Sequence, residues 1–481
     1  MSALLEELRA RQRPQWFDNA KLGIFLHWGL YSVPAFATAT HKSIVDILRE
    51  DPKGAQAKNP YAEWYYNTLR VKGSATAAYH AATYGADTPY ESFKETFETA
   101  LDNFDPAKWA ATFKAAGASY VVLTTKHHDG YLLWPSDAPN PLKDRWQSPR
   151  DLVGELADAC RAQGLKFGIY YSGGLDWTFE PGPIVKPADL LRTVPTSAEY
   201  ISYQDRHFRE LIERVSPSIL WNDIAWPGSD QQFFELAADY YKAVPDGLVN
   251  DRWSSPTLLN KLTKFGPTRA AINAMATRAV RKLESMTPPK PPHFDFRTPE
   301  YSTLKDAGDD KWEATRGIGH SFGYNAQEGT DYLIEGAELV QNFIDIVAHG
   351  GNLLLNLGPR GDATLCPDQV DRLMVLGDWL GQNGEAIFST SMDVRPTTRS
   401  NQGHDIRFTK SADGKTLYAI VLDGKPGDAV TIADLPTIQT ADASLLGHGK
   451  VEAHQEDNGA LAVLLPNEAT IKHAAAVALP L

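Results

Sequence analysis

The amino-acid sequence predicts an α/β fold, with a (β/α)8-like barrel followed by a C-terminal antiparallel β-sandwich. Between about residues 20 and 385, strand-like and helix-like segments alternate along the chain. The strand-like segments are continuous apolar runs, as in parallel sheets that are covered on both faces. After about residue 390, short segments alternate apolar and polar residues, which is typical of antiparallel strands. We therefore expect the barrel over residues 1–388 and the sandwich over residues 389–481.

The first strand and helix show how each unit is recognised. KLGIFLHWG (21–29) is an apolar run, and DPAKWAATFKAAG (105–117) has helical spacing, with Asp105 at its N-cap and Gly117 at its C-cap. An open, doubly wound sheet is the alternative, but no G-x-G-x-x-G motif stands between a strand and a helix. Further units follow in chain order: SYVVLTTKHHDG (119–130), DLVGELADACRAQG (151–164), KFGIYYSGG (166–174), EYISYQDRHFRELIERV (199–215), PSILWNDIAWP (217–227), DQQFFELAADYYKAV (230–244), DGLVNDRW (246–253), AELVQNFIDIVAHGG (337–351) and NLLLNLGP (352–359).

The predicted sandwich begins with a hairpin. HDIRFTKSADGKTLYAIVL (404–422) alternates apolar and polar residues on both sides of an Asp-Gly turn. DAVTIADL (428–435) and GALAVLLP (459–466) continue as short strands at hairpin spacing. Barrels followed by sandwiches are common among sugar hydrolases, although a fold by itself does not establish a function.

A basic insertion, residues 254–293, interrupts the alternation. It carries seven Lys or Arg against one Glu in an otherwise acidic protein. Within it we expect an amphipathic helix, followed by PPKPP (288–292) as an extended connector. The insertion is either a solvated surface segment, or a lid, subunit contact or aglycone wall beside the functional site. The apolar positions at helical spacing are Ile272, Met275, Ala279, Val280 and Leu283.

The composition argues against some classes of partner. The formal net charge of −13 opposes binding to nucleic acid or to an anionic membrane, and no run of about 18 apolar residues predicts a membrane span. The 12 Trp and 19 Tyr suit stacking on sugar rings, although large cores use them too.

The cysteines and the N-terminal segment indicate a reducing compartment. The chain has two cysteines, Cys160 and Cys366, and Cys160 lies on a helical pattern where a buried free thiol is expected. The first residues show no basic end followed by a 7–15-residue apolar core. We therefore expect a cytoplasmic protein, although removal of a leader would leave the same pattern.

Polar residues follow successive predicted strands, and in a barrel such residues converge on one mouth. They include His27, His127, His128, Asp129, Tyr170, Trp177, Trp221, Asp223, Asp251 and Arg252. His127 and His128 resemble metal ligands, but neighbours on a strand point to opposite faces, and no H-x-x-x-H or cysteine pair supports a metal site. Serine or cysteine catalysis lacks a G-x-S-x-G motif. We expect no metal.

Besides metal catalysis and serine or cysteine catalysis, the sequence allows glycoside hydrolysis by two carboxylates, and Asp223 is the first candidate for one of them. It lies in SILWNDIAWPG (218–228), at the end of an apolar run between two tryptophans, where burial makes a charge costly. A strand-end cap is the structural alternative. Histidines, a tyrosine and an arginine would bind ring hydroxyls. Spacing alone leaves the second carboxylate open among Glu63, Asp251, Asp295, Glu300 and Glu313.

Several sequence blocks resemble the α-L-fucosidases of glycoside hydrolase family 29 and occur in that family's order. The blocks span most of residues 14–390, and together they are far more specific than HWG or GGN alone. They are WFDNAKLGIFLHWGLYSVPA (16–35), EWYYN (63–67), LTTKHHDGYLLW (123–134), FGIYYSGGLDW (167–177), LWNDIAWP (220–227), VNDRW (249–253), TRGIGHSFGYN (315–325) and GGNLLLNLGPRGDA (350–363).

The resemblance implies a barrel, a C-terminal β-sandwich and retaining exo-hydrolysis of terminal α-L-fucose without a cofactor. It makes Asp223 the nucleophile, and the pattern DFRTPEY (295–301) makes Glu300 the acid/base, separated from VNDRW by the basic insertion. Asp129, Asp176 and Asp251 are expected to support the neighbouring loops. The implied sugar-binding residues are His27, Glu63, Trp64, His127, His128, Tyr170, Trp221 and Arg252, with Phe322 near the C5 methyl of fucose.

The expected partner is a fucosylated oligosaccharide or glycoconjugate, and a homo-oligomer is left open because many relatives assemble. A non-catalytic fucose-binding protein on the same scaffold, or an enzyme that transfers fucose to a sugar, are the alternative functions. The linkage and the aglycone are not determined by the sequence.

Overall fold

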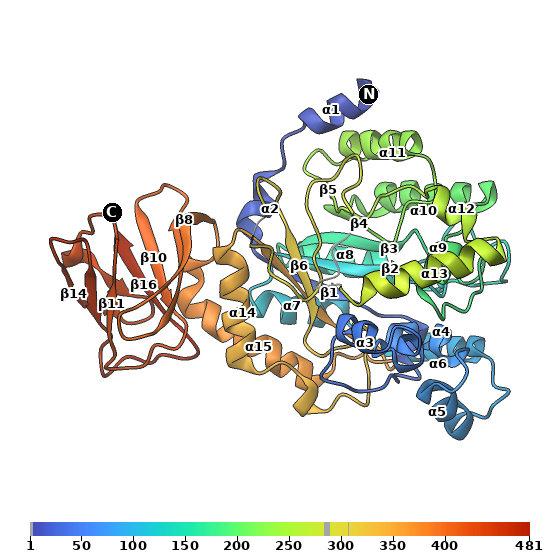
Figure 1. The fold of residues 1–481 in the computed structure, drawn as a ribbon, viewed down its shortest axis with the longest axis horizontal. Coiled ribbons are helices and arrows are strands. Elements are labelled where there is room, and N and C mark those ends of the chain that lie inside the picture. Colours follow the sequence, from blue (N-terminus) through green and yellow to red (C-terminus); the bar gives the residue numbers. More distant parts are fainter. Residues whose placement is uncertain (1–2, 283–288, 306) are drawn as a thin grey trace.

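The computed structural model describes residues 3–282, 289–305 and 307–481 (Figure 1). Its main element is a seven-stranded sheet in the order β5-β4-β3-β2-β1-β7-β6, in which all paired strands are parallel. The strands are β1 (Leu22–Leu26), β2 (Tyr120–Lys126), β3 (Lys166–Ser172), β4 (Ile219–Asp223), β5 (Leu248–Val249), β6 (Glu313–Gly317) and β7 (Asn352–Leu357).

A short segment, residues 295–301, connects the two edges of this sheet. The Asp295 N–H donates to the carbonyl of Val249 on β5 at 2.9 Å, and the Tyr301 N–H donates to the carbonyl of Thr315 on β6 at 2.9 Å. Residues 295–301 therefore take the place of an eighth strand and close the sheet. The (β/α)8-like prediction is confirmed, and the doubly wound alternative is wrong.

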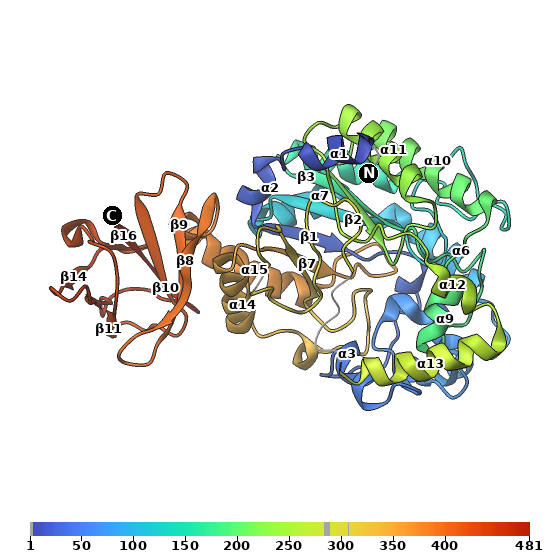
Figure 2. The ribbon, with the colours of Figure 1, turned by 45° about the horizontal axis from the view of Figure 1, so that its top comes forward.

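Helices cover the outer face of the sheet, and further helices lie in the connections (Figures 1 and 2). The outer helices are α7 (Pro106–Ala115), α8 (Leu152–Ala162), α10 (Ala198–Val215), α11 (Asp230–Ala243), α14 (Gly336–Ala348) and α15 (Pro367–Asn383). The others are α1 (Ala3–Ala10), α2 (Gln15–Ala20), α3 (Ile44–Glu50), α4 (Tyr65–Leu69), α5 (Ala75–Thr83), α6 (Phe93–Ala100), α9 (Pro187–Arg192), α12 (Leu258–Leu262) and α13 (Gly266–Val280).

Local signals set the bounds of α7. The Asp105 carboxylate accepts from the Lys108 N–H at 2.9 Å, as an N-cap does, and Pro106 occupies the first turn. Gly117, one residue beyond the C-cap Ala116, has φ +85°, a left-handed conformation that glycine adopts without strain.

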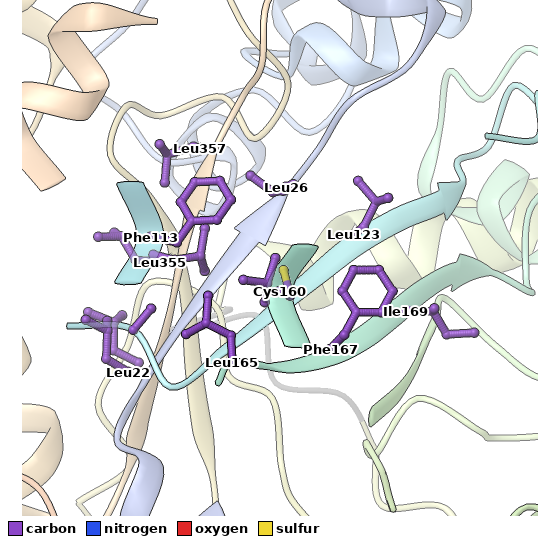
Figure 3. Packing of buried hydrophobic residues seen from close by; sticks show 14 of the residues in the cluster. Leu22, Leu26, Phe113, Leu123, Cys160, Leu165, Phe167, Ile169, Leu355 and Leu357 are labelled. Atoms are coloured by element: carbon purple, nitrogen blue, oxygen red, sulfur yellow. The ribbon is translucent and has the colours of Figure 1, made fainter. Parts of the chain in front are cut away.

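The core lies on both faces of the sheet, which explains the continuous apolar strands. Leu22 and Leu26 of β1 pack toward Phe113 of α7 and the free, buried Cys160 of α8 (Figure 3). Phe25 lies on the opposite face, in a cluster with residues of the barrel interior. Because both faces are buried, alternation along a strand separates two cores rather than core and solvent.

The C-terminal strands form two antiparallel sheets that share one apolar cluster, so the predicted sandwich is confirmed. Six strands are ordered β13-β12-β16-β10-β9-β8 and three are ordered β11-β15-β14. Helices α14 and α15 lie between this region and the barrel sheet (Figure 1), and the Trp379 Nε1–H of α15 donates to the carbonyl of Ala474 at 3.1 Å. The strands are β8 (Thr390–Arg399), β9 (Asp405–Ser411), β10 (Thr416–Val421), β11 (Ala429–Ile432), β12 (Ser444–Leu445), β13 (Gly449–Lys450), β14 (Glu452–Gln455), β15 (Leu461–Leu464) and β16 (Ala475–Pro480).

The basic insertion forms α12 and α13, but the expected apolar face of the helix is not buried. Among its described residues α13 buries none, and Met275 is 71% exposed. Ile272 and Val280 are only partly covered, and Leu283 lies outside the described residues. Helical periodicity therefore predicted the helix, and the structure leaves its described apolar positions exposed or half-buried. In the described ranges, no helix is both long and apolar enough to cross a membrane.

Candidate active site

A pocket of about 590 Å³, including the space open to solvent at its mouth, lies at the carboxyl ends of the barrel strands. All eleven site residues predicted from the sequence line it. The lining is completed by four residues that were not predicted from the sequence: Phe25, Tyr61, Ile224 and Thr315. The eleven are His27, Glu63, Trp64, His127, His128, Tyr170, Trp221, Asp223, Arg252, Glu300 and Phe322.

Asp223 is the last residue of β4, and the chain turns away directly after it because Ile224 has φ +69°. Three donors hold its carboxylate. The Arg252 guanidinium and the Ile224 N–H donate to Oδ1 at 2.8 Å each, and the Tyr170 hydroxyl donates to Oδ2 at 2.7 Å. Burial works to raise the pKa of Asp223, but Arg252 and His128, with these hydrogen bonds, outweigh it and hold that pKa below its usual value. Asp223 is therefore ionised despite its burial.

Arg252 connects two carboxylates across the pocket. Its Nη1 contacts Asp223 and its Nη2 donates to Glu300 Oε1 at 2.6 Å. Its guanidinium also lies over the Trp221 ring, 4.5 Å from the centroid, and its Nε donates to Thr298 Oγ1 at 3.0 Å. Burial opposes the charge, yet Glu300 and Asp223 raise the pKa of Arg252 above its usual value. The side chain is thus a fixed cation between two carboxylates.

Glu300 reaches the pocket through the segment that closes the barrel. The Thr315 N–H donates to the carbonyl of Pro299 at 2.9 Å, and the Tyr301 N–H donates back to Thr315, so β6 holds the backbone on both sides of Glu300. Helices α12 and α13 leave the barrel after β5 and the chain returns to it before Asp295. The long spacing between Asp223 and Glu300 therefore does not displace the carboxylate.

Three of the other carboxylates considered from the sequence do not line the pocket. Asp251 accepts from the Thr298 hydroxyl at 2.6 Å and from Arg297, so it supports the residue that positions Arg252. Asp295 binds the Val249 N–H, and Glu313 accepts from Tyr120 beneath the pocket. These contacts leave Glu63 and Glu300 as the carboxylates that share the pocket with Asp223.

Glu63 is held by the loop that carries Phe322. Its Oε2 accepts from the Gly323 N–H at 2.7 Å and from the Ser321 hydroxyl at 3.3 Å. Burial raises the pKa of Glu63 to about 7, against the lowering effect of the Gly323 hydrogen bond. Glu63 lies in the short 3-10 helix Ala62–Trp64, which also brings Trp64 to the pocket.

The histidines lie just beyond their strands, which explains how two neighbours enter one pocket. β2 ends at Lys126, so His127 and His128 lie in the turn after the strand and their side chains do not have to point to opposite faces. Their ring centroids are 3.9 Å apart. His27 Nδ1 lies 2.7 Å from Asn356 Oδ1, and His128 Nδ1 lies 2.6 Å from Ser172 Oγ. Burial lowers the pKa of His27 to about 4 and that of His128 to about 3. Both imidazoles are therefore neutral hydrogen-bonding groups near pH 7.

One buried histidine nitrogen has no hydrogen-bond partner. Within the described chain, His127 Nδ1 is buried and has no hydrogen-bond partner, which is unfavourable until a polar group meets it. Among the described residues, no group of three or more His, Cys, Asp or Glu side chains is placed to hold a metal ion.

Aromatic rings make up the apolar side of the pocket. Tyr170 stacks on Trp221 with centroids 5.5 Å apart, and Phe322 lies 5.1 Å from His27 and 5.5 Å from Tyr61. Phe25 could have been inferred from the sequence, because it stands two residues before His27 on β1 and therefore shares its face. Tyr61, Ile224 and Thr315 carry no comparable signal.

The two predicted supporting aspartates besides Asp251 lie behind the histidines. Asp176 forms a fully buried ion pair with Lys126 at 2.8 Å, directly before the two histidines. Asp129 accepts from the Tyr90 hydroxyl at 2.8 Å and from the Tyr131 N–H at 3.1 Å. Both bind the turn that follows β2.

Comparisons with known proteins identify the family of the chain. A family model described as alpha-L-fucosidase matches residues 2–385. The alpha-L-fucosidase of Dictyostelium discoideum is 30% identical over 463 residues, covering 93% of this chain and 84% of that protein.

Two solved structures of Thermotoga maritima alpha-fucosidase, each 38% identical in sequence, are also similar. The complex with a mechanism based inhibitor has a TM-score of 0.82 and covers 99% of both chains. The complex with fucose has a TM-score of 0.81 and covers 98% of both chains. The resemblance drawn from the sequence blocks is confirmed: the chain belongs to the α-L-fucosidase family, glycoside hydrolase family 29.

Proposed function

We propose that this protein is a retaining exo-α-L-fucosidase in which Asp223 is the nucleophile and Glu300 is the acid/base. One observation carries the assignment: the guanidinium of Arg252 binds both carboxylates in a pocket that is otherwise lined by histidines and aromatic rings. Retaining glycosidases need two carboxylates only about 5–5.5 Å apart, so that one attacks while the other protonates the leaving group. Because the guanidinium of Arg252 binds both Asp223 and Glu300, the two carboxylates lie close together, as this mechanism requires.

In the first step, Asp223 attacks the anomeric carbon of a terminal α-L-fucose while the glycosidic bond breaks. The bonding electrons go to the leaving oxygen, which takes a proton from Glu300. The product is a fucosyl ester of Asp223. The low pKa of Asp223 keeps the attacking oxygen ionised, and the Tyr170 and Ile224 hydrogen bonds fix its orientation.

In the second step, water attacks the same carbon from the face that the aglycone has left. Glu300, now ionised, takes the proton of the water, and the ester bond to Asp223 breaks. Fucose leaves with its original anomeric configuration, and both carboxyl groups return to their starting states. Arg252 stays within reach of both carboxylates and balances the charge that passes between them.

The remaining lining residues fit a single fucose ring. The neutral side chains of His27, His127 and His128 supply hydrogen bonds to ring hydroxyls, and Phe322 provides an apolar wall for the C5 methyl. Such a wall favours a methyl over a hydroxymethyl group. We take the substrate to be a fucosylated oligosaccharide or glycoconjugate, and we place the end of the catalytic domain at residue 388, before β8.

The direct test compares wild type with Asp223→Ala on 4-nitrophenyl α-L-fucoside. We expect cleavage by the wild type and a loss of at least roughly 10³-fold in the variant, because the covalent step is gone. The β-anomer and 4-nitrophenyl α-galactoside are the controls and should be cleaved poorly. A wild type that binds fucose without cleaving the aryl fucoside would instead identify a fucose-binding protein.

A further inference from the structure

The helix α13 contributes nothing to the core, although it spans 15 residues. None of its described side chains is buried, and the helices it contacts most extensively are the small helices α9 and α3. A side chain fixes its position: the Ala188 N–H of α9 donates to Asn273 Oδ1 at 2.9 Å. A helix with no fully buried side chain adds little to the stability of the fold by packing, so its fixed position calls for another explanation.

A cavity of about 1000 Å³, including its open side, lies where α13 meets α9 and the chain that follows α3. Four cations from three separate segments line it: Lys53, Lys186, Arg278 and Arg281. No carboxylate is among the lining residues, and in the described chain none of the four cations has an ion-pair partner. In a protein with a net charge of −13, this is a concentrated positive site.

Nearby acidic side chains are already engaged with other cations. Asp51, two residues before Lys53, pairs with Lys58 at 2.9 Å. Asp189, three residues after Lys186, contacts Arg192 at 3.6 Å and accepts from the Lys186 N–H at 2.9 Å. The positive charge of the cavity is therefore available to a ligand.

The cavity lies among the connections that follow the carboxyl ends of the barrel strands, as the fucose pocket does. α3, α9 and α13 stand in connections that leave the carboxyl ends of β1, β3 and β5, and they group together in Figure 2. Asn67 of α4 joins the two sites: it exchanges two hydrogen bonds with Ile184, two residues before Lys186, and stands three residues after Trp64 of the pocket. An aglycone attached to a fucose in the pocket has to leave through the mouth of the pocket, which opens among these loops.

We propose that the cavity is an aglycone subsite for an anionic group, a sulfate ester or a carboxylate, on fucosylated glycans. This inference rests on the proposed fucosidase function and adds a substrate class to it. Arginine forks bind both oxyanions by paired hydrogen bonds, and lysine adds charge. The volume suits a sugar residue that carries the anion.

The test uses a fucosylated trisaccharide in three forms: unsubstituted, with one sulfate ester on its galactose, and with a sialic acid in place of that sulfate. We expect the wild type to show a kcat/KM roughly 10-fold higher for an anionic form than for the neutral form, and less at high salt. Lys186→Gln/Arg278→Gln/Arg281→Gln should remove that preference. Lys261→Gln/Lys264→Gln/Arg269→Gln, which removes three charges of the same insertion outside the cavity, should retain it.

Each outcome either supports or overturns the anionic subsite. Preference for either anion, lost only in the cavity variant, supports the subsite and identifies which oxyanion it takes. Equal kcat/KM for the three forms, or equal loss of preference in both variants, overturns it. Cleavage of 4-nitrophenyl α-L-fucoside reports separately on the proposed function. If that activity is absent, calorimetric binding of the sulfated and neutral trisaccharides still tests the cavity.

Discussion

Arg252 is the residue through which the two proposed catalytic carboxylates act together. Its positive charge lowers the pKa of Asp223 against the effect of burial. Arg252→Gln removes that charge, so the pKa of Asp223 should rise. Because attack needs the ionised form, the acid limb of the kcat/KM profile should move to higher pH by about one unit or more. A profile from pH 3 to 9 measures this, and a limb that stays in place with only KM changed would contradict the assignment.

Glu300 and Glu63 share the pocket, and mutagenesis separates their roles. Glu300→Gln should reduce kcat/KM by about 10²–10⁴-fold on a natural fucosyl disaccharide, because leaving-group protonation is lost. The loss should be much smaller on 4-nitrophenyl α-L-fucoside, whose leaving group needs little protonation. Glu63→Gln is the matched control and should affect both substrates alike, since Glu63 is held by Gly323 and Ser321 rather than by Arg252. The reverse pattern would transfer the acid role to Glu63.

Among the residues that line the pocket, those with charged, imidazole or other strongly polar or aromatic side chains in family-specific blocks were predictable from the sequence, whereas Tyr61 and Thr315 were not. The eleven predicted residues stand in blocks that name their family, but Tyr61 and Thr315 enter the pocket through a loop and the β6 edge. Their position depends on tertiary packing, which no spacing along the chain encodes. The contact of Arg252 with both carboxylates also follows only from the closed barrel.

The element that places Glu300 is the closing segment 295–301, and its anchor is Asp295. The Asp295 carboxylate accepts from the Val249 N–H and the Tyr241 hydroxyl at 2.7 Å each and from Arg11 at 3.1 Å. Asp295→Ala should cost about 2–4 kcal/mol of unfolding free energy, because buried donors lose their acceptor. It should also lower kcat on disaccharides.

Urea unfolding and kinetics test this prediction together. Asp442→Ala is the control, since its partner Lys450 lies at the surface, and it should change stability by less than about 1 kcal/mol. An Asp295→Ala variant with wild-type stability and wild-type kcat would show that the segment does not depend on this anchor.

At the element scale, strands with long apolar runs were predictable and the closing segment was not. β1, β2, β3, β4 and β7 coincide with the apolar runs, since burial on both faces demands such residues. Residues 295–301 contain a proline and several polar residues. They join the sheet through isolated bridges to Trp312 and to Thr315 of β6, and through the hydrogen bond from Asp295 to Val249 of β5. Helix α13 was predictable from its periodicity, although its apolar positions face no core.

The whole molecule buries several carboxyl groups, and this gives its stability a particular pH dependence. Burial raises the pKa of Glu328 to about 8, against its ordinary value of 4.5. The folded state therefore holds a proton that the unfolded state lacks between these pH values. Stability should fall as pH rises from about 4.5 to 8, and Glu63 and Glu313, with pKa values of about 7, add to the same slope.

Glu328→Gln isolates one part of this slope. A neutral amide oxygen can still accept from the His320 and Ser321 N–H groups, which now donate to Glu328 Oε1 at 3.1 and 3.0 Å. The variant should match wild type near pH 5 and exceed it near pH 9 by up to a few kcal/mol. Thermal unfolding at both pH values measures the difference, and parallel pH slopes in the two proteins would refute the buried titration.

Trapping the covalent intermediate tests directly whether Asp223 is the nucleophile. The enzyme is incubated with a 2-fluoro-fucosyl fluoride, whose fluorine slows release of the ester, and is then examined by intact-mass and peptide mass spectrometry. We predict that the chain gains one 2-fluoro-fucosyl group, and that it is attached to Asp223 in the peptide containing LWNDIAWP. Absence of the label from active enzyme, or a label on Glu63 or Glu300, would contradict the assignment of Asp223 as the nucleophile.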